Sequence, residues 1–434
     1  MATYYLSETG DDTASGTAPN SAWRSLARAS AAVYEDGDVI VLESGHSFAG
    51  TLVLRGARLT VKSSGDERAA ILAGSSEGIR AENCSLTLDN MAIQGTCDFE
   101  TETGNDGCGV VVSAALPSSE RVSGLKLLNL KVSGFKRAGI CVRGGVIGGL
   151  KSGFDGVLIE GCEAFENGGA GIVVGGVMDQ FATDYCHRNV HVRSCRSWSN
   201  RGIGSQNSHS GSGIVISDVE GGSITQCTAY HNGELNAFAG GGPVGIWCWD
   251  CHSVTISHCH SFENRTKTKD GGGFDLDGGC VNCVLEHNYS RDNAGSGYLI
   301  CQFTNARPFH GNTVRHCISV NDGLLNGGGI LVYNDGTGIS DCEFHDNLLV
   351  SRATEGFEIP APLRMLTPSV GMNFHDNVFV TDGLVPMVEA VAGQQGLTAF
   401  GNIFSDAIGT SKFLWAGKEC DLKELKEISG LEWN

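Results

Sequence analysis

The sequence predicts an all-β solenoid, in which short strands stack on one another along the length of the chain. The first observation is a repeat through its middle, where a glycine is followed by four strand-forming residues, as in Gly213-Ile-Val-Ile-Ser. Successive copies begin 32, 42, 32, 28, 24 and 32 residues apart. Such irregular repetition of one supersecondary unit is typical of solenoid proteins. The repeat begins at Gly139, Gly171, Gly213, Gly245, Gly273, Gly297 and Gly329.

A second repeat supports the same fold class. A strand is followed by a cysteine, and an asparagine usually follows that cysteine after five residues. Because each coil places the same slot above the last, we expect an inward stack of cysteines and, at the turn, a ladder of Asn amides that hydrogen-bond to one another. The seven pairs, two of them with one substitution, are Cys162/Asn167, Cys195/Asn200, Cys227/Asn232, Cys259/Asn264, Asn288/Asn293, Cys317/Asp322 and Cys342/Asn347.

Strand alternation divides each glycine repeat between two faces. The first and third residues after the glycine are nearly all apolar and are assigned to the core, so the second and fourth are assigned to solvent. In two neighbouring coils the outward residues are Trp247 and Trp249, then Asp275 and Asp277. Stacked strands lie about 4.8 Å apart. The sequence therefore predicts two exposed tryptophans beside two exposed aspartates.

We expect a single domain over residues 1–434, because each repeat of a solenoid packs only on its neighbours and the usual limit on core size does not apply. Residues 1–38 are predicted to form an N-terminal cap, 39–395 the coils, and 396–434 a last coil with a C-terminal cap. The repeat lengths predict about 11 to 13 coils.

The caps and the first coils have their own predicted elements. The N-terminal cap is expected to contain a strand at Tyr4–Leu6 and an amphipathic helix over 21–34, because Trp23 and Val33 fall at helical spacing with other apolar residues. A terminal helix is expected at Leu422–Ile428. The strands of the first coils are predicted at 39–42, 52–54, 59–61, 70–72 and 86–88.

The charge and the hydrophobic content of the chain limit the partners that we expect for it. The net charge of −19 disfavours nucleic acid as a partner, because phosphate binding needs clustered Lys or Arg. No apolar run approaches the length of a membrane-spanning helix, so no membrane partner is expected. The first residues lack a basic and apolar leader. We expect a secreted or periplasmic protein whose leader is absent from this sequence, or else a cytoplasmic one; the oligomeric state stays open.

The opening of the chain resembles the N-terminal cap of the right-handed parallel β-helix superfamily, which is typified by pectate lyases and polygalacturonases. The similar segments are 4–10, 16–17, 22–26 and 37–42, and the Asn ladder is similar as well. The resemblance covers nearly the whole chain and implies a right-handed parallel β-helix that acts on a polysaccharide. The superfold hosts lyases, hydrolases, epimerases and phage adhesins. The polygalacturonase signatures Asn-Thr-Asp, Gly-His-Gly and Arg-Ile-Lys are absent here.

Asp275 and Asp277 are the predicted catalytic pair. Paired carboxylates serve glycoside hydrolysis as acid and base or nucleophile, so a glycoside hydrolase that needs no cofactor is the first hypothesis. The pair is also compatible with a cation site. A lyase or epimerase on a uronic-acid polymer is the alternative, with Lys267, Lys269 or His209 as base and Ca²⁺ held by the aspartates. A non-catalytic glycan-binding β-helix is the third class.

Long loops beside the same strands are expected to wall a groove for a poly- or oligosaccharide. Trp247 and Trp249 would offer flat faces to sugar rings. Other expected substrate-binding residues are Gln206, Asn207, His209, Lys267, Lys269, Asp270, Tyr185, His187, Gln302, Arg307 and Tyr333.

Cys280 and Cys283 form a Cys-x-x-Cys motif, which serves as half of a zinc site or as a redox pair in some proteins. We expect neither a second pair nor a histidine cluster beside it. A structural role at a turn is therefore favoured, and no metal site is expected.

Overall fold

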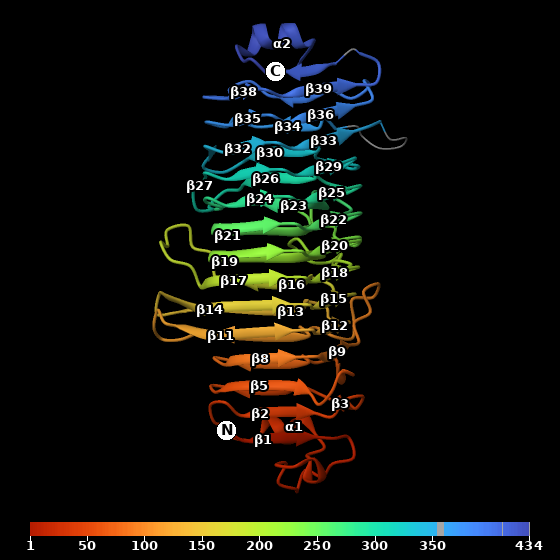
Figure 1. Cartoon of the computed structure of the whole chain (residues 1–434), viewed down its shortest axis with the longest axis vertical. Coiled ribbons are helices and arrows are strands. Elements are labelled where there is room, and N and C mark those ends of the chain that lie inside the picture. The colour runs from red at the N-terminus through yellow and green to blue at the C-terminus, as the bar shows by residue number, and fades with distance from the viewer. Residues whose placement is uncertain (354–359, 410, 434) are drawn as a thin grey trace.

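A computed structural model describes residues 1–353, 360–409 and 411–433, and it forms one long stack of coils. The two ends of the chain lie at opposite ends of the stack (Figure 1). Each full coil contributes strands to three faces, and neighbouring strands on a face run parallel. The third face alone is a sheet of 13 strands, in agreement with the predicted number of coils. Neither described helix has the length and apolar character that crossing a membrane requires.

The first face carries the glycine repeats. Two of its strands are long enough to continue around the corner onto the second face, namely β19 (Ser212–Thr225) and β21 (Val244–Ser257). The other strands of the first face are β4 (Leu52–Arg55), β7 (Ile79–Glu82), β10 (Val110–Ala114), β13 (Ala138–Ile147), β16 (Ala170–Gly175), β23 (Gly272–Leu276), β26 (Tyr298–Gln302), β30 (Ile330–Asn334), β34 (Leu363–Met365), β37 (Val388–Ala390) and β40 (Phe413–Trp415).

The second face follows the first in each coil. Its strands, besides the ends of β19 and β21, are β1 (Thr3–Leu6), β2 (Val39–Leu42), β5 (Arg58–Ser63), β8 (Ser85–Asp89), β11 (Arg121–Leu128), β14 (Leu150–Glu160), β17 (His187–Arg193), β24 (Val284–Glu286), β28 (Thr313–Arg315), β32 (Glu343–His345), β35 (Asn373–His375) and β38 (Thr398–Phe400).

The third face closes each coil. Its strands are β3 (Ser47–Ala49), β6 (Ala69–Gly74), β9 (Met91–Gly95), β12 (Lys131–Ser133), β15 (Glu163–Phe165), β18 (Arg196–Trp198), β20 (Thr228–Tyr230), β22 (His260–Phe262), β25 (Tyr289–Arg291), β29 (Ile318–Val320), β33 (Leu348–Ser351), β36 (Val378–Thr381) and β39 (Ile403–Asp406). Outside the three faces lie the short pair β27 (Phe309–His310) and β31 (Ile339–Ser340), and β41 (Lys418–Cys420), which runs antiparallel to β40.

The repeat glycines are required by packing. A Cβ on Gly171, Gly245 or Gly273 would lie 2.0–2.2 Å from a serine hydroxyl of the third face, and other contacts come from the Asn ladder. No larger residue fits that slot. The residues one and three positions later are buried in every copy of the repeat, as predicted.

The Asn ladder is confirmed and runs along the corner after the third face. Each rung's Nδ2 donates to the Oδ1 of the next rung at 2.7–3.0 Å. The ladder ends in a carboxyl, because Asn293 donates to Oδ1 of Asp322. Its rungs are Asn167, Asn200, Asn232, Asn264, Asn293 and Asp322.

The seventh predicted pair is wrong in register. Since Ile318 pairs with Leu348, Asn347 lies above Cys317 and not above Asp322. Asn347 starts a second ladder in the cysteine slot, with Asn377 and Asn402 above it. Cys342 instead precedes a strand of the second face, because Thr313 pairs with Glu343.

The two caps differ in how well they match the prediction. Helix α2 (Leu422–Ser429) covers the C-terminal end as predicted, starting in a capping box at Asp421 and ending at Gly430. Helix α1 is only Leu26–Ser30, and Val33 is 90% exposed. The longer helix fails because Trp23 bridges to Leu6 as a strand and stacks on Tyr4.

Candidate active site

A cavity of about 600 Å³ opens on the first face, above strands β21, β23, β26, β30 and β34. It brings together eight of the predicted site residues. These are His209, Trp247, Trp249, Lys269, Asp270, Asp275, Asp277 and Tyr333.

Loops between the third and first faces build the wall beside the tryptophans. Phe238 and the glycines 240–242 line this side. Asp270 anchors the wall, because its Oδ2 accepts a hydrogen bond of 2.6 Å from the N–H of Gly242. Asn326 clamps the backbone of Asp270 from a later coil, accepting from its N–H at 3.1 Å and donating to its carbonyl at 3.2 Å.

Trp247 is buried, which corrects the prediction of an exposed side chain. It is 4% exposed, and its Nε1–H donates to the hydroxyl of Ser212 at 3.2 Å. The ring of His209 meets it edge to face at 5.2 Å. The side chain points away from the core of the coils, as predicted, but loops cover it. Trp249 is half-buried in the cavity, 6.3 Å from the ring of Phe303.

Asp275 lies on the cavity floor directly beside Trp247, with which it is in register. Its predicted exposure is wrong, because the side chain is only 2% exposed. Oδ1 has no hydrogen-bond partner in the described protein. Burial raises the pKa of Asp275 well above its ordinary value, and the carboxyls of Asp277 and Asp270 raise it further.

Asp277 follows the end of β23 and shares the cavity. Its Oδ1 accepts a hydrogen bond of 2.7 Å from the N–H of Gly278. Burial raises the pKa of Asp277 to about 7, although the Gly278 N–H opposes the shift. The pKa of Asp270 is raised by burial as well, against the effect of the Gly242 N–H. The cavity therefore holds two carboxyls with raised pKa values, that of Asp277 at about 7 and that of Asp275 well above its ordinary value.

Four predicted groove residues lie outside the cavity as buried structural groups, so their predicted place was wrong. Gln302 is fully buried and its amide donates to the carbonyl of Arg307 at 2.8 Å. His187 is fully buried between Phe154 and Gly175. Tyr185 packs under the guanidinium of Arg307 at 4.2 Å.

Arg307 itself belongs to a buried ion network. Its Nε lies 2.9 Å from a carboxylate oxygen of Asp250, and Nη2 lies 3.4 Å from Asp218. Lys151 pairs with Asp218 at 2.8 Å. The network ties loops to the sheet and leaves Arg307 no free face for a substrate.

Three further predicted residues stand apart from the cavity. Lys267 and Asn207 are exposed on loops and do not line it. Gln206 donates from its amide to Ser208 and to the carbonyl of His209, which shapes the loop that carries His209.

Sequence reasoning missed several lining residues. Arg364 points into the cavity from β34, held by Glu389 at 2.7 Å and by the carbonyl of Gly327 at 2.8 Å. Its place could have been predicted by extending the strand repeat by one coil, because Arg364 lies between the inward residues Leu363 and Met365. Phe303, Asn326 and Asp335 also line the cavity, but they belong to irregular loops without a periodic signal.

Comparison with known proteins agrees with this architecture. The family described as right-handed β-helix region matches residues 118–349. A crystal structure of the GH136 lacto-N-biosidase from Eubacterium ramulus has a TM-score of 0.53 and 17% identity, over 93% of this chain and 68% of that one. The A-module of the Azotobacter vinelandii mannuronan C-5 epimerase AlgE4 has a TM-score of 0.54 and 11% identity, over 85% and 87%.

At these identities the similarity to solved structures shows the fold alone. No curated protein sequence matches the chain. The family match spans more than half of the 434 residues. This chain therefore belongs to the right-handed β-helix family.

Proposed function

We propose that this protein hydrolyses glycosidic bonds of an oligo- or polysaccharide in the cavity on its first face. Two of the compared structures are named for activity on carbohydrates, a lacto-N-biosidase and a mannuronan C-5 epimerase, which supports a carbohydrate substrate. The observation that carries the proposal is the carboxyl of Asp275, which is buried at the cavity floor and whose Oδ1 has no hydrogen-bond partner in the described part of the chain. A buried polar atom without a partner costs stability, so it is retained most readily where a substrate supplies the partner.

The two carboxyls have different roles in this mechanism. Asp275, whose pKa burial raises well above the ordinary value, serves as the acid and donates a proton to the leaving-group oxygen. Asp277, with a pKa of about 7, is partly ionised at neutral pH. Asp277 is the second carboxylate of the mechanism. It either activates a water molecule as general base or attacks the anomeric carbon as nucleophile.

The walls supply sugar contacts. Trp249 is half-buried beside Phe303 and offers an apolar face to ring C–H groups. Lys269, Tyr333 and Arg364 bring polar groups to the same cavity, where they can bind hydroxyls. A volume of about 600 Å³ lies within the usual range of ligand pockets.

Hydrolysis is favoured over a cation-dependent reaction by the spacing of the carboxyls. Among the described residues, no set of three oxygens taken one each from Asp270, Asp275 and Asp277 lies within 4.8 Å of one another. A Ca²⁺ ion takes six to eight oxygen ligands at about 2.3–2.6 Å. The three aspartates would have to move to hold one.

A digest of a glycan library, analysed by mass with and without chelator, tests the proposal. We expect products that have gained one water per cleaved bond, with the chelator having no effect. Products with an unsaturated uronic end would establish a lyase instead, and an isomerised polymer of unchanged mass an epimerase. Binding without turnover of any glycan would establish a binding protein.

A further inference from the structure

Four buried cysteines lie in two neighbouring coils where the first face turns into the second. Cys248 and Cys251 lie in β21, and Cys280 and Cys283 lie in the next coil, just before β24. Their spacing is Cys-x₂-Cys-x₂₈-Cys-x₂-Cys. Two Cys-x₂-Cys pairs are the pattern of tetrathiolate zinc sites, usually about 15–20 residues apart, and here one coil of the solenoid separates them by 28 residues. The expectation that no second pair stands beside Cys280 and Cys283 is therefore wrong.

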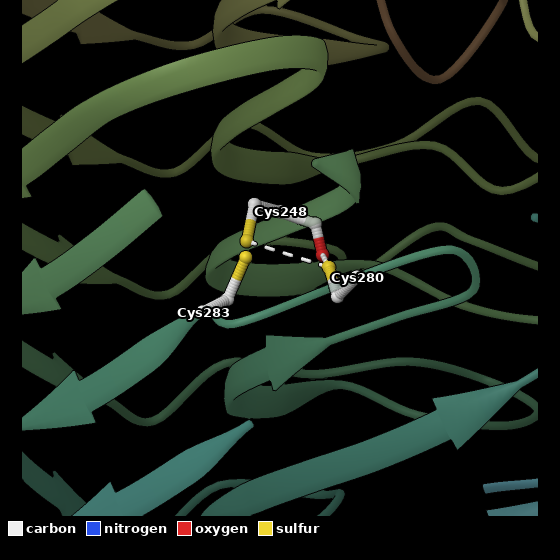
Figure 2. A group of neighbouring side chains, drawn as sticks. All are labelled: Cys248, Cys280 and Cys283. Carbon is white, nitrogen blue, oxygen red and sulfur yellow. Dashed lines mark hydrogen bonds between the residues drawn. The ribbon is translucent and has the colours of Figure 1, made fainter. Parts of the chain in front are cut away.

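Three of these thiols already converge. The Sγ atoms of Cys248, Cys280 and Cys283 all lie within 4.8 Å of one another, and the Sγ atoms of Cys248 and Cys280 are 3.8 Å apart. Figure 2 shows the three sulfurs pointing toward one another from the two coils. With Zn–S bonds of about 2.3 Å, the edge of a tetrahedral ZnS₄ site is about 3.8 Å. All four cysteines are completely buried.

Cys251 is placed to complete the group. It is three residues from Cys248 on the same strand and directly below the coil of Cys283, whose Sγ lies 3.6 Å from the Cys251 carbonyl. Its thiol now donates to the carbonyl of Trp249 at 3.2 Å. To join the other three thiols at a metal, the Cys251 side chain would have to turn away from this carbonyl and give up this weak hydrogen bond.

The cysteine ladder is a useful contrast within the same core. Cys195, Cys227 and Cys259 occupy one slot in successive coils, and each thiol donates to a carbonyl two residues earlier at 3.2–3.3 Å. A neighbouring N–H lies 3.4 Å from the sulfur of Cys227 and of Cys259. Within the described residues, these thiols form no group of three within 4.8 Å. Stacking alone therefore does not produce the convergence at Cys248.

We propose that Cys248, Cys280 and Cys283, with Cys251 as fourth ligand, bind a structural zinc ion in the core beneath the candidate active site. Binding replaces four S–H bonds by four Zn–S bonds and releases four protons, with no change of oxidation state. Thiolate ligands select zinc and other soft metals, and zinc adds no redox chemistry.

Such an ion would cross-link the two coils that carry the cavity floor. Cys248 lies between Trp247 and Trp249 in the chain, and its carbonyl accepts the N–H of Asp277 at 2.9 Å. Because the site is sealed, the metal has to enter during folding.

The test refolds the full-length protein in reductant with Zn²⁺ or Co²⁺ and measures bound metal by mass spectrometry after gel filtration. We expect about one equivalent per chain for the wild type and less than about a tenth for Cys280→Ser. Cys227→Ser, in the stack of Cys195, Cys227 and Cys259, is the matched control and should keep its metal. A wild-type protein without metal, or equal metal in Cys280→Ser, would overturn the proposal.

X-ray absorption of the zinc-loaded wild type gives a second readout, which does not need any variant to fold. A shell of sulfur alone at about 2.3 Å is expected. A shell dominated by nitrogen would place the zinc elsewhere and overturn the proposal. The stacked surface histidines His258, His287 and His316 would then be the candidates. A disulfide joining Cys248 to Cys280 or Cys283 in the purified protein would overturn it as well.

Discussion

Asp322 and Asp275 are both buried aspartates, yet their surroundings differ. Each is 2% exposed, and burial raises both pKa values. Asp322, the last rung of the ladder, accepts hydrogen bonds from the amide of Asn293 at 2.7 Å and from the hydroxyl of Ser319 at 2.6 Å. One oxygen of Asp275 has no hydrogen-bond donor among the residues that the structure describes. One carboxyl is satisfied by the protein, and the other faces a cavity.

This difference in hydrogen bonding distinguishes an aspartate that is buried for the stability of the fold from one that is buried for function. A satisfied carboxyl in a repeating slot can be exchanged for the residue that fills that slot in other coils. An unsatisfied carboxyl on a cavity floor has no such replacement within the fold. The cysteines differ in another way: thiols of both kinds have carbonyl partners, but within the described residues three sulfurs lie within 4.8 Å of one another only at Cys248, Cys280 and Cys283.

The largest expected effect belongs to Asp277→Asn, together with Asp275→Asn. We expect turnover of the identified glycan to fall by at least about a hundredfold, because acid–base assistance is lost. The wild-type rate should follow a bell-shaped pH profile whose acidic limb lies near pH 7, where the pair loses its first proton. Circular dichroism should be unchanged. Wild-type turnover in this variant would end the carboxylate-pair mechanism.

Trp249→Ala should weaken binding without unfolding the coils. The half-buried ring lines the cavity and packs on the small cluster of Val215, Val244 and Trp247, outside the main core of the coils, so we expect KM to rise about tenfold, equivalent to ~1.4 kcal/mol. Trp198→Ala is the matched control, because Trp198 stacks between Phe165 and Tyr230 on the third face. That change should lower Tm and leave KM alone. A fall in Tm for Trp249→Ala as large as for Trp198→Ala would contradict the assignment.

Asp322→Asn should stabilise the fold above pH 7. The folded-state pKa of Asp322 is about 7, above the ordinary 3.8, so the wild type loses stability as pH rises from about 4 to 7. An asparagine can donate to Ser319 as Asn293 does to Ser290. We expect Tm to rise by a few degrees at pH 8 and the gain to vanish near pH 4. A loss of stability at pH 8 would show that the ladder requires the carboxyl.

The repeating parts of the molecule were predicted well from the sequence, because the same residue types occupy the same positions in successive coils. The inward residues after each glycine and the first six ladder pairs follow from periodicity. Where a coil is shorter than its neighbours, periodicity does not show which of two stacked positions an asparagine occupies. Asn347 was therefore assigned to the Asn ladder, although it lies above Cys317. It also gives only the direction of Trp247 and Asp275, whereas their burial depends on loops. Arg307 was misplaced because its partners Asp218 and Asp250 are distant in the chain.

The most direct test of the account compares turnover and Tm of Asp275→Asn and Asp322→Asn, each measured beside the wild type on the same glycan at pH 8. The account predicts that Asp275→Asn loses at least about a hundredfold in kcat with its fold intact. It predicts that Asp322→Asn keeps kcat within about twofold and gains stability. Wild-type turnover by Asp275→Asn, or an equal loss of turnover in both variants, would contradict the claim that the cavity carboxyl performs the chemistry.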